Sequence, residues 1–442
     1  MTIQQEIEVQ EEVFDPKIHL AYEAPKTRLT LSDLKIQGSA TSTPIAATSP
    51  FPILSHEGIL AYRRALFRRD VLHKCAFPAF PGTLILRNAA EHSTFIEDFW
   101  THPETLRLVS DAAGVPLSIV MRTEIGHTNI QTSGRSLNEM IDSLSVEPDT
   151  TKIQLSDEEK AYDPLRSNSI IPWHYDSYPY VCVLMLSDTD GMVGGETYIK
   201  TGEGVPAKVE GPAIGHGVLL QGGEVQHLAA RALGVKERIS TITSYCAEVP
   251  GLYDSSFITN IRPYTDIKVL YKQWTSYRLE KMRYEIDRLQ SEISQSPGGL
   301  DISAVETFVE DQINYLKRTS RQLIPLEQYD KLLEKFGKGE LYNVSELWER
   351  AEKLPYFSEC AISAHQWNWM PDSPLWYDLA HTQVEIRAGK ELESQKGRFR
   401  WQKDRQFLMG DELLRQGLPE LFLSWLDATG LYSMLVKMRT SL

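Results

Sequence analysis

The feature that most constrains the fold is a strand-like stretch between Pro172 and Ser244 in which polar residues interrupt apolar runs. His174 and Asp176 are separated by one residue, and His227 ends a later apolar segment. Side chains two residues apart in a strand point to the same face, so the first pair can reach one ion. Two imidazoles and a carboxylate can bind Fe(II) from one side and leave coordination positions open. The pattern predicts a β-barrel built around a metal site.

An arginine and a hydroxyl follow the second histidine. Arg238 and Ser240 are also two residues apart, so a strand would present both side chains on one face. The guanidinium group is a planar fork of donors that matches a carboxylate. We therefore expect this pair to hold the far carboxylate of a dicarboxylic co-substrate.

Two neighbouring residues are alternatives for these roles. His216 could be the second imidazole, but it lies in a glycine-broken segment, 211–217, that predicts a loop. Arg231 is nearer to His227 than Arg238 is, but no hydroxyl follows it and alanines surround it. An isolated His-x-Asp pair is usually a satisfied polar group. The ordered set of five residues favours His227 and Arg238.

The order His174-x-Asp176, His227, Arg238-x-Ser240 resembles the 2-oxoglutarate- and Fe(II)-dependent dioxygenase superfamily. The segments 194–197 and 221–227 are similar to stretches in its small-molecule branch, including fungal specialised-metabolism enzymes. The resemblance covers roughly residues 50–250. It implies an α+β fold with a double-stranded β-helix, a jelly-roll or cupin-like barrel, with flanking helices and a helical C-terminal extension.

The resemblance also implies an activity. His174, Asp176 and His227 would hold Fe(II) as the catalytic centre, and Arg238 and Ser240 would bind 2-oxoglutarate. O2 and a small organic molecule would then react by hydroxylation, desaturation or cyclisation, with release of succinate and CO2. Three alternatives remain open: a cupin-type metal enzyme that does not use 2-oxoglutarate, a protein or peptide hydroxylase, and a non-enzymatic scaffold.

A polar strand is predicted to lead towards the site, over residues 118–131. Strict alternation puts Arg122 and Glu124 on one face and a second polar set on the other, unless a bulge at Gly126 changes the register. The second set is His127, Asn129 and Gln131. We expect Asn129 and Gln131 to contact substrate or co-substrate, although an outer strand with a solvated face would show the same pattern.

Composition limits the partners. The 442 residues carry a net charge of -14, which argues against nucleic acid because phosphate binding needs a basic surface. The four cysteines have no paired spacing, which fits a reducing compartment, so we expect a cytoplasmic protein. No run of eighteen apolar residues occurs, and no membrane association is expected.

Three regions are expected along the chain. Residues 1–50 are predicted to be an extended or partly disordered lead-in, residues 51–250 the dioxygenase domain, and residues 251–442 a helical C-terminal extension. The extension would cover the barrel or form a homodimer contact. The polar connection 132–170 is a candidate lid or a surface insertion. An amphipathic helix over 55–67 is expected, with Arg63 and Arg64 on its solvated face.

Overall fold

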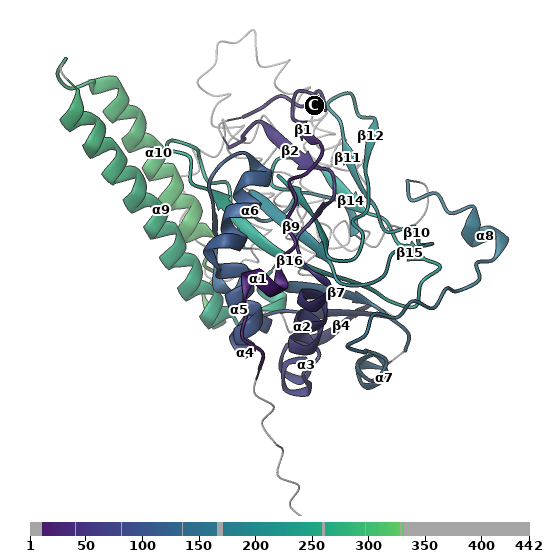
Figure 1. The fold of residues 1–442 in the computed structure, drawn as a ribbon. Coiled ribbons are helices and arrows are strands. Elements are labelled where there is room, and N and C mark those ends of the chain that lie inside the picture. The colour runs from purple at the N-terminus through teal and green to yellow at the C-terminus, as the bar shows by residue number, and fades with distance from the viewer. Residues whose placement is uncertain are drawn as a thin grey trace, which may run out of the picture. The chain divides into compact units, whose positions relative to one another are not determined.

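The computed structural model describes residues 11–330 apart from 40, 81, 135, 166–170, 259, 260, 297 and 328. The chain divides into two compact units, Met1–Leu326 and Glu327–Leu442, and the fold described here belongs to the first (Figure 1). The helices expected between 344 and 438, and the aromatic cluster around Trp367 and Trp376, lie outside the described residues. The homodimer contact stays a prediction.

A large antiparallel sheet forms the centre of the first unit (Figure 1). Its central strand β9 (Tyr180–Met185) is a continuous apolar run, as expected of a strand buried on both faces. In order across the sheet, the strands are β1 (Arg28–Thr30), β2 (Ile45–Thr48), β13 (His216–Leu220), β9, β16 (Arg238–Ala247), β7 (His127–Gln131), β5 (Thr83–Leu86) and β4 (Ala76–Phe80). Two further strands, β3 (Phe51–Pro52) and β6 (Leu117–Ile119), pair with β13 and β16.

A second sheet carries the histidines. Its strand order is β12 (Pro206–Val209), β11 (Thr197–Lys200), β14 (His227–Ala229) and β8 (Ile171–His174), and β10 (Val193–Gly194) pairs with β15 (Ala232–Leu233) nearby. Every pairing between described strands is antiparallel. The predicted α+β class is confirmed, whereas hydrogen bonds among the described strands do not close a barrel.

Helices flank the large sheet. Helix α2 (His56–Leu66) begins at the predicted cap Ser55, whose side chain accepts a hydrogen bond from Gly58 N. Its apolar face and that of α5 (Thr94–Thr101) pack into the main core. The other helical segments are α1 (Pro16–His19), α3 (Arg69–Cys75), α4 (Ala89–His92), α6 (Pro103–Ala113), α7 (Leu137–Asp142), α8 (Asp157–Lys160), and the 3-10 turns η1 (Arg122–Glu124) and η2 (Arg262–Tyr264).

Two predictions for the N-terminal part need correction. Residues 11–50 are not an extended or disordered lead-in, because they form α1, β1 and β2 and bury Phe14 and Leu31 in the core. Arg63 is not on a solvated face: its side chain is fully buried and lies 2.8 Å from the Glu237 carboxylate. The same guanidinium donates to the carbonyl oxygens of Leu186 and Val146, so it ties α2 to the sheet.

Two long helices follow the sheets, as predicted. Helices α9 (Ile267–Gln295) and α10 (Ile302–Arg321) form an antiparallel pair (Figure 1). Arg278 of α9 is fully buried; it lies 2.8 Å from the Asp254 carboxylate and donates to Thr319 Oγ1. Its guanidinium also stacks on the ring of Tyr315. This buried ion pair therefore joins α9, α10 and the segment after β16.

Removing one partner of that ion pair should destabilise the fold. We expect Asp254→Ala to cost about 3–5 kcal/mol of unfolding free energy, because Arg278 would be left as an unpaired buried charge. The exposed Arg283→Ala on the same helix should stay within about 0.5 kcal/mol. Urea unfolding of both variants measures the difference. Equal midpoints for Asp254→Ala and the wild type would contradict the role of the pair.

Candidate active site

Strand pairing brings the two distant histidines together. His174 is the last residue of β8 and His227 the first of β14, and the two residues are direct partners in the antiparallel register. Their ring centroids are 4.2 Å apart. Asp176 follows β8 by two residues. The three predicted metal ligands therefore come from one end of the second sheet.

The three side chains have the geometry of a metal site. The Nε2 atoms of His174 and His227 each lie 3.6 Å from a carboxylate oxygen of Asp176. One ligand atom from each residue can be chosen so that all three lie within 4.8 Å of one another. His227 Nδ1 lies 3.0 Å from the carbonyl oxygen of Val225, so this nitrogen is the donor and Nε2 offers its lone pair. The donor set suits Fe(II).

A glycine that the sequence reasoning missed positions the carboxylate. The backbone N–H of Asp176 donates to the carbonyl of Gly222 at 2.9 Å. A Cβ atom at Gly222 would lie 1.7 Å from Asp176 Oδ2, far inside van der Waals contact. Only a residue without a side chain therefore leaves room for this carboxylate. The Gly222-Gly223 pair before His227 was the available signal, but its purpose depends on a contact across the fold.

Arg238 is the first residue of β16 in the large sheet, and one of the donors of its guanidinium makes no hydrogen bond to the described residues. Nη1 donates to Ser240 Oγ at 3.3 Å and Nη2 to the carbonyl of Gly195 at 3.2 Å. Its Nε is buried and has no hydrogen-bond partner in the described part of the chain. Desolvation lowers the pKa of Arg238 to about 10, so the group still carries its charge at neutral pH. A desolvated cation with a spare donor suits a carboxylate.

The predicted polar strand lies beside this arginine. In β7, Asn129 pairs with Ser240 and Gln131 with Arg238, so each pair shares a face of the sheet. The continuous strand predicted over 118–131 is wrong, because η1 and Gly126, with φ of 66°, separate β6 from β7. The polar face begins at His127. The sequence placed His127 on this face, but only Asn129 and Gln131 were predicted to contact substrate or co-substrate.

The two alternatives lie elsewhere. His216 is the first residue of β13 rather than a loop residue, and its Nδ1 lies 3.1 Å from the carbonyl of Ile214. The side chain of Arg231 is exposed. In the connection 132–165, the structure has α7 and α8, and Lys152 forms an ion pair with Asp188. Residues 166–170 lie outside the described residues, so a lid stays a prediction.

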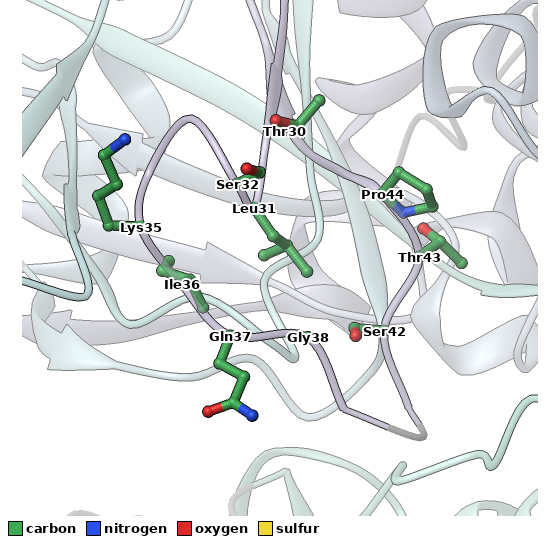
Figure 2. Close-up of a pocket in the computed structure, with 10 residues that line it drawn as sticks. All are labelled: Thr30, Leu31, Ser32, Lys35, Ile36, Gln37, Gly38, Ser42, Thr43 and Pro44. Carbon is green, nitrogen blue, oxygen red and sulfur yellow. The ribbon is translucent and has the colours of Figure 1, made fainter.

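A surface hollow is separate from these residues. Figure 2 shows it in the loop between β1 and β2, where Leu31, Lys35 and Ile36 contribute to its wall. Among the described residues that line the hollow, Lys35 alone is charged, and none of them belongs to the histidine and aspartate cluster. The hollow therefore offers no comparable set of chemical groups.

No family model matches the chain, and no curated protein sequence matches it. Solved structures of 2-oxoglutarate/Fe(II) oxygenases are similar to it. The epimerase SnoN from nogalamycin biosynthesis is 15% identical with a TM-score of 0.29, over 44% of this chain and 74% of that one. HygX from Streptomyces hygroscopicus, with nickel, 2-oxoglutarate and hygromycin B bound, is 16% identical with a TM-score of 0.28, over 47% and 85%.

A prolyl-4-hydroxylase from Pseudomonas putida is also similar, with 17% identity and a TM-score of 0.25 over 43% of this chain and 86% of that one. At such low TM-scores and identities the likeness carries no functional argument, which has to come from the site itself. Within the described residues, no helix is both long enough and apolar enough to cross a bilayer.

Proposed function

We propose that the chain is a non-haem Fe(II)- and 2-oxoglutarate-dependent oxygenase that oxidises a small organic molecule by hydroxylation, desaturation or cyclisation. The observation that carries the proposal is the convergence of His174, Asp176 and His227 on one point. Two imidazoles and a carboxylate on one side of an ion leave coordination positions for co-substrate and O2. The first unit would then be a double-stranded β-helix, with the ligands on one sheet and Arg238 on the other.

Each residue would have a defined part. The three ligands would hold Fe(II), which together with 2-oxoglutarate supplies the activation of O2. Arg238 would bind the far carboxylate of 2-oxoglutarate, and Ser240, 3.3 Å from Nη1, would orient the guanidinium. The strongly acidic chain, with a net charge of -14, disfavours a polyanionic substrate.

A cupin-type metal enzyme without 2-oxoglutarate is the main rival. It would share the metal ligands, but it would have no use for a desolvated arginine. Arg238 is half-buried, and a cation whose Nε is buried without a partner in the described chain is costly to keep without an anion. Among the described residues, the Arg238 guanidinium hydrogen-bonds to the Ser240 hydroxyl and the Gly195 carbonyl and to no carboxylate. The site therefore favours an anionic ligand and, with it, 2-oxoglutarate.

Arg238→Ala tests this proposal. Purified wild-type protein with Fe(II), ascorbate and 2-oxoglutarate should form succinate, and one compound from a panel of small metabolites should increase it. In Arg238→Ala the Kd for 2-oxoglutarate should rise about 10- to 100-fold, as expected when a charged hydrogen bond is lost. Calorimetry on the metal-loaded protein measures this, and metal affinity should not change.

Arg231→Ala is the matched control, because Arg231 is exposed and should bind 2-oxoglutarate like the wild type. Unchanged 2-oxoglutarate affinity in Arg238→Ala would contradict the assignment of the clamp. Activity that does not depend on 2-oxoglutarate at all would favour the cupin-type rival.

A further inference from the structure

His127 has no part in the function proposed above, yet one of its nitrogens is buried without a partner. It begins β7, two pairs beyond Asn129 and Ser240, and is the direct partner of Ile242 in β16. Its Nε2 atom has no partner within hydrogen-bond distance among the described residues, although the Asn129 side chain lies near enough to the ring to influence it weakly. Buried polar atoms in proteins are nearly always hydrogen-bonded, so an orphan atom beside a candidate active site calls for a ligand.

A neighbouring ion pair determines which nitrogen carries the proton. Arg87 Nη1 lies 3.4 Å from His127 Nδ1, and its Nη2 is bonded to the Glu124 carboxylate. A guanidinium has donors only, so Nδ1 must accept and the proton must be on Nε2. Desolvation and the charge of Arg87 lower the pKa of His127 to about 3, against smaller opposing effects of Asp176 and Asn129. The ring is therefore a neutral donor through Nε2.

The position of His127 relative to the arginine clamp indicates the ligand. The hydrogen bond from Arg238 Nη1 to Ser240 Oγ draws the guanidinium towards the Ser240–Asn129 pair. The next pair on that face, His127 with Ile242, lies two residues along the strand, or about 7 Å. An extended five-carbon dicarboxylate can bridge this spacing. A dicarboxylate with one end at Arg238 would have its other end near His127. Asp176 is close enough to His127 for its charge to raise the pKa of that ring.

We propose that His127 Nε2–H donates a hydrogen bond to an oxygen at the metal-chelating end of the dicarboxylic co-substrate. Glu124 holds Arg87, and Arg87 in turn fixes the tautomer of His127, so the donor is set before the co-substrate binds. Arg238 and His127 would then hold opposite ends of one molecule. The inference rests on the function proposed above, because it takes 2-oxoglutarate as the ligand.

His127→Phe removes the donor and keeps a planar ring. Calorimetric titration of 2-oxoglutarate into the Zn(II)-loaded protein should give a Kd about 10-fold or more above that of the wild type, while Zn(II) affinity is unchanged. His127→Gln, whose amide can donate from nearly the same point, should recover part of the loss. His216→Phe, outside the ligand cluster, should bind 2-oxoglutarate like the wild type.

A second readout does not depend on any variant. In a histidine-selective 15N–1H correlation spectrum of the Zn(II)-loaded wild type, His127 should be the Nε2–H tautomer, and its Nε2–H signal should shift when 2-oxoglutarate is added. An Nδ1–H tautomer, or unchanged affinity in His127→Phe, would overturn the inference and leave the proposed function standing. A wild type that binds Zn(II) but not 2-oxoglutarate would overturn both. If His127→Phe changed only the affinity for the substrate to be oxidised and not that for 2-oxoglutarate, the role proposed for His127 would also be overturned.

Discussion

His227→Ala is expected to abolish stable metal binding. The variant keeps His174 and Asp176 but loses one of the three donors that lie within 4.8 Å of one another. Loss of an outer-shell partner alone typically weakens a metal site about 10- to 100-fold, so loss of a direct ligand should cost at least about 100-fold. Calorimetric titration with Ni(II), or with Fe(II) in the absence of O2, gives the Kd directly.

Thermal unfolding provides a second measure of the same effect. A metal at about 100 times its Kd stabilises the folded wild type by about 2.7 kcal/mol, whereas His227→Ala should gain almost nothing at that concentration. The matched control is His216→Ala, since His216 lies on β13 outside the cluster. Tight Ni(II) binding by folded His227→Ala, or its loss in His216→Ala, would mean that the metal site has been wrongly assigned.

Gly222→Ala should weaken metal binding through a residue that never contacts the ion. The new methyl group would lie 1.7 Å from Asp176 Oδ2, so the carboxylate or the backbone must move. A displaced Asp176 carboxylate would no longer converge with the two histidines on one ion. We therefore expect metal affinity to fall about 10- to 100-fold. The same crowding should lower the unfolding free energy by about 1–3 kcal/mol.

Gly211→Ala separates this crowding from a general effect of losing a glycine. A Cβ at Gly211 would meet only ordinary contacts, of which the nearest is 3.8 Å away. That variant should bind Ni(II) like the wild type. If Gly222→Ala also bound the metal with wild-type affinity, Asp176 would have room that the structure does not provide, and its position as a ligand would be in doubt.

The sequence correctly predicted that His174, Asp176 and His227 would lie together, whereas their binding of Fe(II) remains a proposal. The proximity of His174 and Asp176 is local because only one residue separates them, although β8 ends at His174 and Asp176 lies just beyond the strand. The apolar run of β9 and the cap at Ser55 are local in the same way, and the structure contains both. The resemblance implied the α+β fold class, which the structure confirms, and the roles of Arg238 and Ser240 remain a proposal.

Arg63 shows where the local argument failed. Its helix is amphipathic, and an arginine next to Arg64 is usually solvated, yet Arg63 is buried against Glu237. Burial of a charge depends on its partner, and this partner lies more than 170 residues away in the chain. No helical pattern contains that information. The N-terminal lead-in was misjudged for the same reason, since β2 pairs with the distant strand β13 and β1 pairs with β2.

By itself, the sequence determined the types of group at the candidate site, two imidazoles and a carboxylate, and the strand-forming segments in which the two histidines lie. Only the tertiary structure decided the rest. The pairing of β8 with β14 sets the separation of the two histidines, the close approach of Gly222 sets the place of Asp176, and the contact with Arg87 sets the proton on His127. These depend on distances between segments remote in the chain, which residue spacing cannot encode.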